Sequence, residues 1–169
     1  GAMANNILSF KGSPIGKSTK EDNYELIIDD IFKTAKKNSC LIYYPEDVAV
    51  GKSTEDKAVI KDLIEVSNDD IILDIGPKTI SKIKDIIENS ETILWNGPVG
   101  YFENPNFANG SFEIAKKIIE KNKNNQIYSV AGGGDTIAVL NKMESINNFN
   151  FVSTAGGAFL EYLEGKTLP

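Results

Sequence analysis

The length and composition of this chain fit one compact domain, because 169 residues of which 41% are hydrophobic can bury a sizeable core but fall short of two ordinary domains. Its net charge is −6, its 18 basic residues are all lysines, and it has neither arginine nor histidine. The chain alone therefore cannot provide a Ser-His-Asp triad, a His-ligated zinc site or an arginine finger, and its dispersed lysines do not favour nucleic-acid binding.

The first segment of interest, KGSPIGKS (residues 11–18), ends like a phosphate-binding P-loop. A P-loop needs four residues between its two glycines, but Gly12 and Gly16 enclose only three, and Pro14 removes a backbone N–H. The preceding ANNILSF has a helical pattern rather than that of a buried strand. We predict a surface turn, with Ser18 as the N-cap of a helix that begins near Glu21.

From there to the C-terminus, short apolar runs alternate with amphipathic stretches, which predicts an α/β fold with a doubly wound, mainly parallel sheet in three layers. The predicted strands are 40–44, 47–50, 70–75, 92–95, 127–131 and 150–154, and the clearest predicted helices are 21–37, 78–88, 107–121, 134–143 and 157–163. The only cysteine, Cys40, excludes an internal disulfide. It begins the run CLIYY, and we expect a buried strand residue rather than a nucleophile.

No apolar run approaches the roughly 20 residues needed to cross a bilayer, and no signal-peptide pattern opens the chain. We therefore expect a cytoplasmic protein without membrane contacts.

Two loops that follow predicted strands have unusual compositions. In LDIGPKT (73–79), Gly76 and Pro77 end the strand and Thr79 can cap the next helix, as in an ordinary turn between a strand and a helix. The longer WNGPVGYFENPNF (95–107) is rich in glycine, proline and aromatic residues. A structural loop of that length is usually polar, so a binding role is as plausible as a structural one.

The loop VAGGGDT (130–136) is the most informative segment. Its three glycines between a strand and a helix allow a ligand to approach the backbone, and the N–H groups of the helix N-terminus suit phosphate. Asp135 would repel a bare phosphate, which indicates a divalent cation such as Mg²⁺ between the two, and Thr136 adds a hydroxyl. The alternative is a tight turn in which Asp135 only caps the helix.

STAGGAF (153–159) repeats this pattern, with Ser153 and Thr154 as possible donors beside a second glycine-rich helix start. Two such loops favour a polyphosphate site. Neither matches GxGxxG, so a dinucleotide site is the weaker hypothesis.

In this order and spacing, LWNGPVGYFE, GGGDT and STAGGAFLEYLEGKTLP resemble the C-terminal half of phosphoglycerate kinases, as do GAMANNILSFKGSPIGKS and LDIGPKT. The resemblance covers essentially the whole chain. It implies most of a Rossmann-like nucleotide domain, truncated at both ends, from a glycolytic, Mg²⁺-dependent enzyme. Such an enzyme transfers a phosphoryl group between 1,3-bisphosphoglycerate and ADP, giving ATP and 3-phosphoglycerate, and the full-length enzyme would be a monomer.

The resemblance also implies roles for individual residues. Glu103 would contact the ribose, Leu73 would line the adenine pocket, and Asp135 would bind the metal. The remaining nucleotide-binding residues would be Asn96, Gly97, Pro98, Gly133, Gly134 and Thr136. Gly156 and Gly157 would form the helix start that faces the transferred phosphoryl group, although Ala155 stands where many members have a third glycine.

Other parts of the family pattern have no counterpart here. The N-terminal domain that binds phosphoglycerate is one of them, and a lysine that reaches the nucleotide phosphates is another. We therefore expect a fragment that binds MgADP or MgATP without turnover. A module that never had a catalytic partner domain and a purely structural domain are the alternatives, and Gly1-Ala2-Met3 is either family sequence or a cloning remnant.

Overall fold

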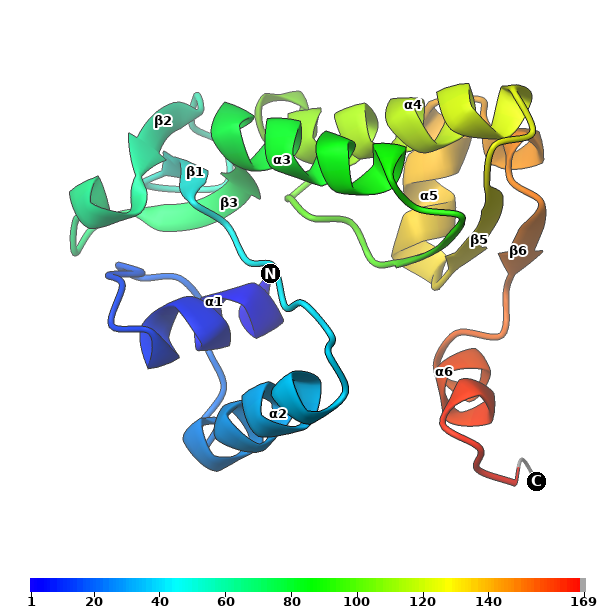
Figure 1. The fold of residues 1–169 in the computed structure, drawn as a ribbon. Coiled ribbons are helices and arrows are strands. Elements are labelled where there is room, and N and C mark those ends of the chain that lie inside the picture. Colours follow the sequence, from blue (N-terminus) through cyan, green and yellow to red (C-terminus); the bar gives the residue numbers. More distant parts are fainter. Residues whose placement is uncertain (168–169) are drawn as a thin grey trace.

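The computed structural model describes residues 1–167, which form two three-stranded sheets with six α-helices around them (Figure 1). The strands are β1 (Asp47–Gly51), β2 (Val59–Asp62), β3 (Ile71–Ile75), β4 (Thr92–Asn96), β5 (Tyr128–Gly132) and β6 (Phe151–Ser153). The helices are α1 (Ala2–Phe10), α2 (Glu25–Lys37), α3 (Pro77–Glu88), α4 (Asn109–Lys123), α5 (Gly134–Lys142) and α6 (Gly157–Leu163). Within residues 1–167, no helix combines the length and apolar character that a membrane span requires.

The predicted α/β class is confirmed, but the predicted single, mainly parallel sheet is wrong for the first half of the chain. Strands β4, β5 and β6 pair in parallel and in that order, whereas β2, β1 and β3 form a separate antiparallel sheet. The connection 52–58 explains part of this difference, because it is too short for the usual parallel crossover of about a dozen residues or more, so β2 returns antiparallel beside β1. The segment 63–70 then crosses β1, and β3 pairs antiparallel with the other edge of that strand.

The predicted strand 40–44 is also wrong. These residues form an extended connection between α2 and β1 that pairs with no other strand of the described residues, and Cys40 is exposed. Leu41 is 78% exposed, so the apolar character of CLIYY does not reflect burial at this position. Conversely, β2 was missed because Val59 and Ile60 lie on an exposed edge strand with only a weak alternating pattern.

The segment 11–18 is a turn between α1 and α2, as predicted, but it is anchored to β3 rather than lying free on the surface. Gly16 forms an isolated antiparallel bridge with Ile71. The Ser18 hydroxyl accepts a hydrogen bond from the backbone N–H of Ile72, the next residue of β3 (N–Oγ 2.8 Å). Ser18 is therefore not the N-cap of α2, which begins at Glu25 instead of near Glu21. A P-loop is absent here, in agreement with the spacing argument.

The main core lies between the parallel sheet and the layer formed by α3, α4 and α5 (Figure 1). Trp95 of β4, Ile118 of α4 and Leu140 of α5 are among its buried side chains. A second, smaller cluster, Val48, Val50 and Val66, lies under the antiparallel sheet. The parallel sheet therefore has a packed helical layer on one face.

The start of α3 is capped by a neighbouring strand rather than by Thr79, contrary to the prediction. The buried carboxylate of Asp47 in β1 accepts hydrogen bonds from the backbone N–H groups of Lys78 (2.9 Å) and Thr79 (2.8 Å) and from the Thr79 hydroxyl (2.7 Å). A Cβ on Gly76 would come within 2.3 Å of this carboxylate, so only glycine fits beside it. The N-terminus of α3 is therefore closed to external anions.

Candidate functional site

A cavity of about 510 Å³ lies where the ends of β3 and the 96–103 loop meet the start of α5. Its lining includes five residues that the resemblance assigned to the nucleotide: Leu73, Gly97, Pro98, Glu103 and Asp135. These come from three separate segments of the chain. The structure thus gathers base, ribose and metal candidates around one space, which is within the usual size range of ligand pockets.

The 96–103 loop is held across the end of β3 by specific hydrogen bonds. The N–H of Tyr101 donates to the carbonyl of Leu73 (2.6 Å), and the N–H of Val99 donates to the Ser111 hydroxyl (3.0 Å). The N–H of Gly97 donates to the hydroxyl of Thr136, which is fully buried (2.7 Å). Thr136 therefore joins the loop to the first turn of α5.

Asp74, adjacent to Leu73, lies against both this loop and the start of α4. Its buried carboxylate accepts hydrogen bonds from the N–H groups of Ile75 and Gly110, both at 2.8 Å. A Cβ on Gly100 or on Gly110 would approach an Asp74 oxygen within 2.3 Å. The two glycines thus allow the loop and the start of α4 to close over the same carboxylate.

Burial raises the pKa of Asp74 from 3.8 to about 6, although the hydrogen bonds from Gly110 and Ile75 act in the opposite direction. Between about pH 4 and pH 6 the folded chain therefore holds a proton that the unfolded chain has lost. The contribution of Asp74 to the free energy of unfolding is thus most favourable below pH 4. About 3 kcal/mol of this contribution is lost as the pH rises through 6.

This pH dependence can be measured by urea denaturation of the wild type and of Asp74→Asn between pH 4 and pH 8. The variant loses one acceptor, which lowers its stability by an amount independent of pH, while carboxylates such as Asp70 and Glu113, whose pKa values are lowered, contribute equally to both chains. We expect the difference in unfolding free energy between the two chains to change between pH 4 and pH 6. Parallel curves would contradict the raised pKa.

The phosphate loop predicted from VAGGGDT joins β5 to α5 directly beside Asn96. Gly133 has φ +87°, which favours glycine, and a Cβ on Gly132 or Gly133 would lie 3.2 or 3.1 Å from the Asn96 side-chain oxygen. Gly134 begins α5, and Asp135 is exposed in its first turn. The loop therefore leaves the backbone of Gly133 and Gly134 and the Asp135 carboxylate accessible at a helix N-terminus.

No group of three or more acidic, histidine or cysteine side chains suited to a metal occurs among residues 1–167. The Asp135 carboxylate is an oxygen donor of the type that Mg²⁺ prefers, and it is exposed next to the cavity. It fits a Mg²⁺ whose other ligands are water and phosphate oxygens, which is the usual arrangement of this ion with nucleotides.

Gly156 and Gly157 do not line the cavity. Gly156 has φ +54° and turns the chain into α6, which extends away from the end of β6 (Figure 1). Phe159 of α6 packs near Phe151 (ring centroids 6.3 Å apart) and lies close to Gly132. The α6 start thus approaches the end of β5 but remains apart from the cavity lining.

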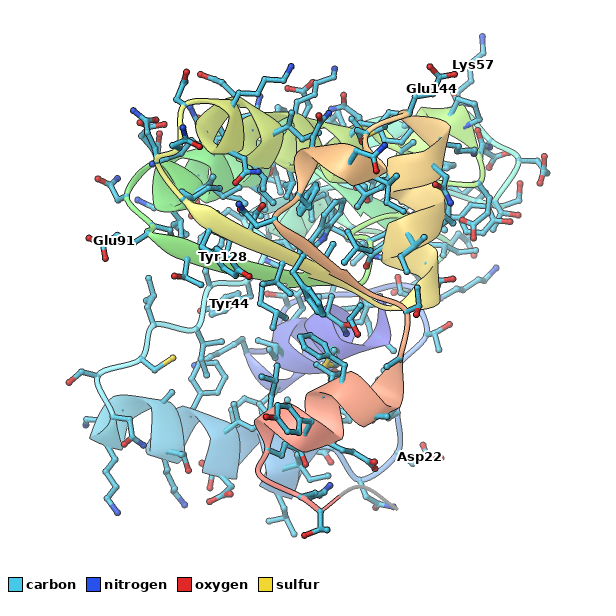
Figure 2. All side chains as sticks on the ribbon, turned by 90° about the vertical axis from the view of Figure 1, so that its right-hand side faces the viewer. Asp22, Tyr44, Lys57, Glu91, Tyr128 and Glu144 are labelled. Carbon is cyan, nitrogen blue, oxygen red and sulfur yellow. The ribbon has the colours of Figure 1, made fainter. Side chains whose placement is uncertain are left out.

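The candidate segments that follow β4, β5 and β6 lie at one end of the parallel sheet, and Leu73 of the antiparallel sheet joins them through its hydrogen bond with Tyr101. Glu91 and Tyr128 mark the opposite end, where β4 and β5 begin, and in Figure 2 the strands run from these two residues towards α5 and the loops. The carboxyl ends of parallel strands are where open α/β sheets bind their ligands.

Sequence reasoning missed several residues that line the cavity: Gly1, Ala2, Asn5, Thr19, Ile71, Ile72, Gly100, Tyr101 and Phe102. Asn5 is buried and its amide donates to the Thr19 carbonyl (2.9 Å), which closes the cavity on the α1 side. The position of Thr19 directly after KGSPIGKS was a possible signal. The contribution of α1 could not be seen without the tertiary structure.

A family model described as phosphoglycerate kinase matches residues 1–166. This chain belongs to the phosphoglycerate kinase family. The phosphoglycerate kinases of Wolbachia pipientis (strain wPip) and Zymomonas mobilis are both 42% identical to it over 171 residues, and the chain covers 43% of each. The chain thus spans less than half the length of these curated relatives.

Solved phosphoglycerate kinase structures support the same conclusion. The structure from Coxiella burnetii superposes with a TM-score of 0.92 at 37% identity, over 100% of this chain and 43% of the other. The structure from Pyrococcus horikoshii OT3 has a TM-score of 0.71 at 30% identity, and the match covers 98% of this chain and 41% of the other. The combination of one parallel and one antiparallel sheet is therefore a fold found within the phosphoglycerate kinase family.

Proposed function

We propose that this chain forms the MgADP/MgATP half-site of a glycolytic phosphotransferase that moves a phosphoryl group between 1,3-bisphosphoglycerate and ADP. The observation that carries the proposal is the single cavity that unites Leu73, Glu103 and Asp135 in a member of the phosphoglycerate kinase family. In this proposal the chain is most of the C-terminal, Rossmann-like nucleotide domain of a cytoplasmic, monomeric enzyme.

In this half-site, individual side chains and backbone groups have separate roles. Leu73 contacts the adenine, Glu103 accepts hydrogen bonds from the ribose, and the 96–98 strip lies along the nucleotide. The backbone N–H groups at Gly133 and Gly134 bind phosphate oxygens, favoured by the helix dipole. Thr136 contributes by holding Gly97 in place through its buried hydroxyl.

Asp135 would hold the Mg²⁺, which, when bound, neutralises negative charge on the phosphates. Phosphoryl transfer depends mainly on positioning and charge neutralisation, with little covalent chemistry by the protein. Gly156 and Gly157 are proposed to face the transferred phosphoryl group. They lie outside the cavity lining, and Phe159 of the same helix lies close to Gly132 at the end of β5.

The isolated chain is proposed to bind nucleotide without turnover. It has no arginine to stabilise the charge of the transition state, and phosphoglycerate would be bound by parts of the enzyme that this chain does not contain. A non-catalytic nucleotide-binding module, which would have the same glycine loops, is the second candidate.

A thermal melt with and without MgADP tests the proposal. Ligand at 100 times its dissociation constant adds about 2.7 kcal/mol, which raises the melting temperature of a domain of this size by roughly 5–10 °C. The shift should disappear when EDTA removes Mg²⁺. A folded chain whose melting temperature does not respond to MgADP would contradict the proposed half-site.

A further inference from the structure

Lys142, in the last turn of α5, contacts the far end of the loop that carries Glu103. Its ammonium donates to the backbone carbonyl of Phe102 (3.0 Å) and lies 3.4 Å from that of Glu103. It also lies 5.4 Å from the centroid of the Phe102 ring, within range of a cation–π interaction. Lys142 thus binds the backbone at Glu103 and leaves the Glu103 carboxylate free.

The same helix holds the near end of this loop through Thr136 and Gly97. Thr136 and Lys142 lie in the first and last turns of α5, about 9 Å apart along its axis at 1.5 Å per residue. The helix that begins with the phosphate loop therefore fixes the loop at two points. Phe102, between the lysine and the core, is itself 7% exposed, so its carbonyl has a well-defined position.

We infer that Lys142 is a positioning residue that sets the location of Glu103 relative to the phosphate loop, an inference that rests on the proposed function. A lysine suits this task because its ammonium has three donors and can satisfy two carbonyls and a ring face together. Without it, the end of the loop loses its only charged contact with α5 among the described residues, and Glu103 samples more positions.

A ligand with a modified ribose isolates this role. Isothermal titration calorimetry would compare MgADP with the 2′,3′-dideoxy analogue, which lacks both ribose hydroxyls, for the wild type, Lys142→Met and Lys142→Arg. Lys123→Met serves as the matched control, because Lys123 is also an exposed lysine in the last turn of a helix but, within residues 1–167, makes no hydrogen bond to the 96–103 loop.

We expect Lys142→Met to weaken MgADP binding about three- to tenfold and to leave binding of the dideoxy analogue within about twofold of the wild type. Lys142→Arg, which retains donors and charge, should restore most of the affinity, and Lys123→Met should behave as the wild type. Equal weakening of both ligands by Lys142→Met would overturn the inference. Failure of the wild type to bind MgADP would instead overturn the proposed function itself.

Hydrogen exchange tests the inference without any ligand. The N–H groups of Tyr101 and Asn104 are hydrogen-bonded to the carbonyls of Leu73 and Tyr101. In Lys142→Met, exchange at residues 101–104 should become faster while α4 remains unchanged. Unaltered exchange in this segment would show that Lys142 does not hold the loop, whatever the binding data show.

Discussion

Replacement of Asp47 by alanine is expected to lower the free energy of unfolding by about 3 kcal/mol or more. The Thr79 hydroxyl keeps a partner in the backbone carbonyl of residue 47 (3.1 Å), which alanine retains. The substitution leaves two donors without a partner, namely the N–H groups of Lys78 and Thr79. Each is at the first turn of α3, where the helix itself provides no acceptor. A buried donor that loses its acceptor costs about 1–3 kcal/mol, and Asp47 is 1% exposed.

Urea denaturation measures this loss, with Asp29→Ala as the control. Asp29 also interacts with a lysine, Lys33, but through an exposed ion pair at 2.6 Å between side chains that are 45% and 73% exposed. Such pairs contribute about 1 kcal/mol or less. If both variants lose the same small amount, the cap provided by Asp47 is not an important source of stability.

The sequence predicted the second half of the fold better than the first, for a physical reason. Strands β4, β5 and β6 are separated by helices, so their parallel pairing follows from the alternation alone. The first sheet depends on two short connections and an exposed edge strand, and β2 has little hydrophobic pattern to reveal it. An apolar run such as CLIYY shows that burial is possible but does not show that a neighbouring strand exists.

The candidate site shows the same limit. Gly133, Gly134 and the adjacent Asp135 could be predicted as phosphate and metal candidates from residue type, because glycines leave backbone N–H groups accessible at a helix start, with a tight turn capped by Asp135 as the alternative. The contributions of Asn5, Thr19 and Lys142 could not, since each depends on contacts between distant segments. Thr136 was expected as a donor to the ligand, and the structure uses its hydroxyl as an acceptor for Gly97.

Asp135→Asn is expected to abolish the Mg²⁺-dependent part of nucleotide binding. In the proposed half-site its carboxylate holds the ion, and an amide is a much weaker ligand for Mg²⁺. The 5–10 °C rise in melting temperature expected with MgADP should fall to roughly 2 °C or less in this variant. Glu91→Gln removes one exposed carboxylate at the opposite end of the sheet (Figure 2) and should leave the rise unchanged.

The same variant should have the reverse effect when Mg²⁺ is absent. The Asp135 carboxylate repels bare phosphates at the α5 N-terminus, so its removal should strengthen binding of metal-free ADP, by about 1 kcal/mol or less at this exposed position. Damage to the loop would weaken both forms of the nucleotide, whereas a metal-binding role weakens one and strengthens the other. Titration calorimetry with and without Mg²⁺ therefore separates the two explanations, and weaker binding of both forms would reject Asp135 as the metal ligand.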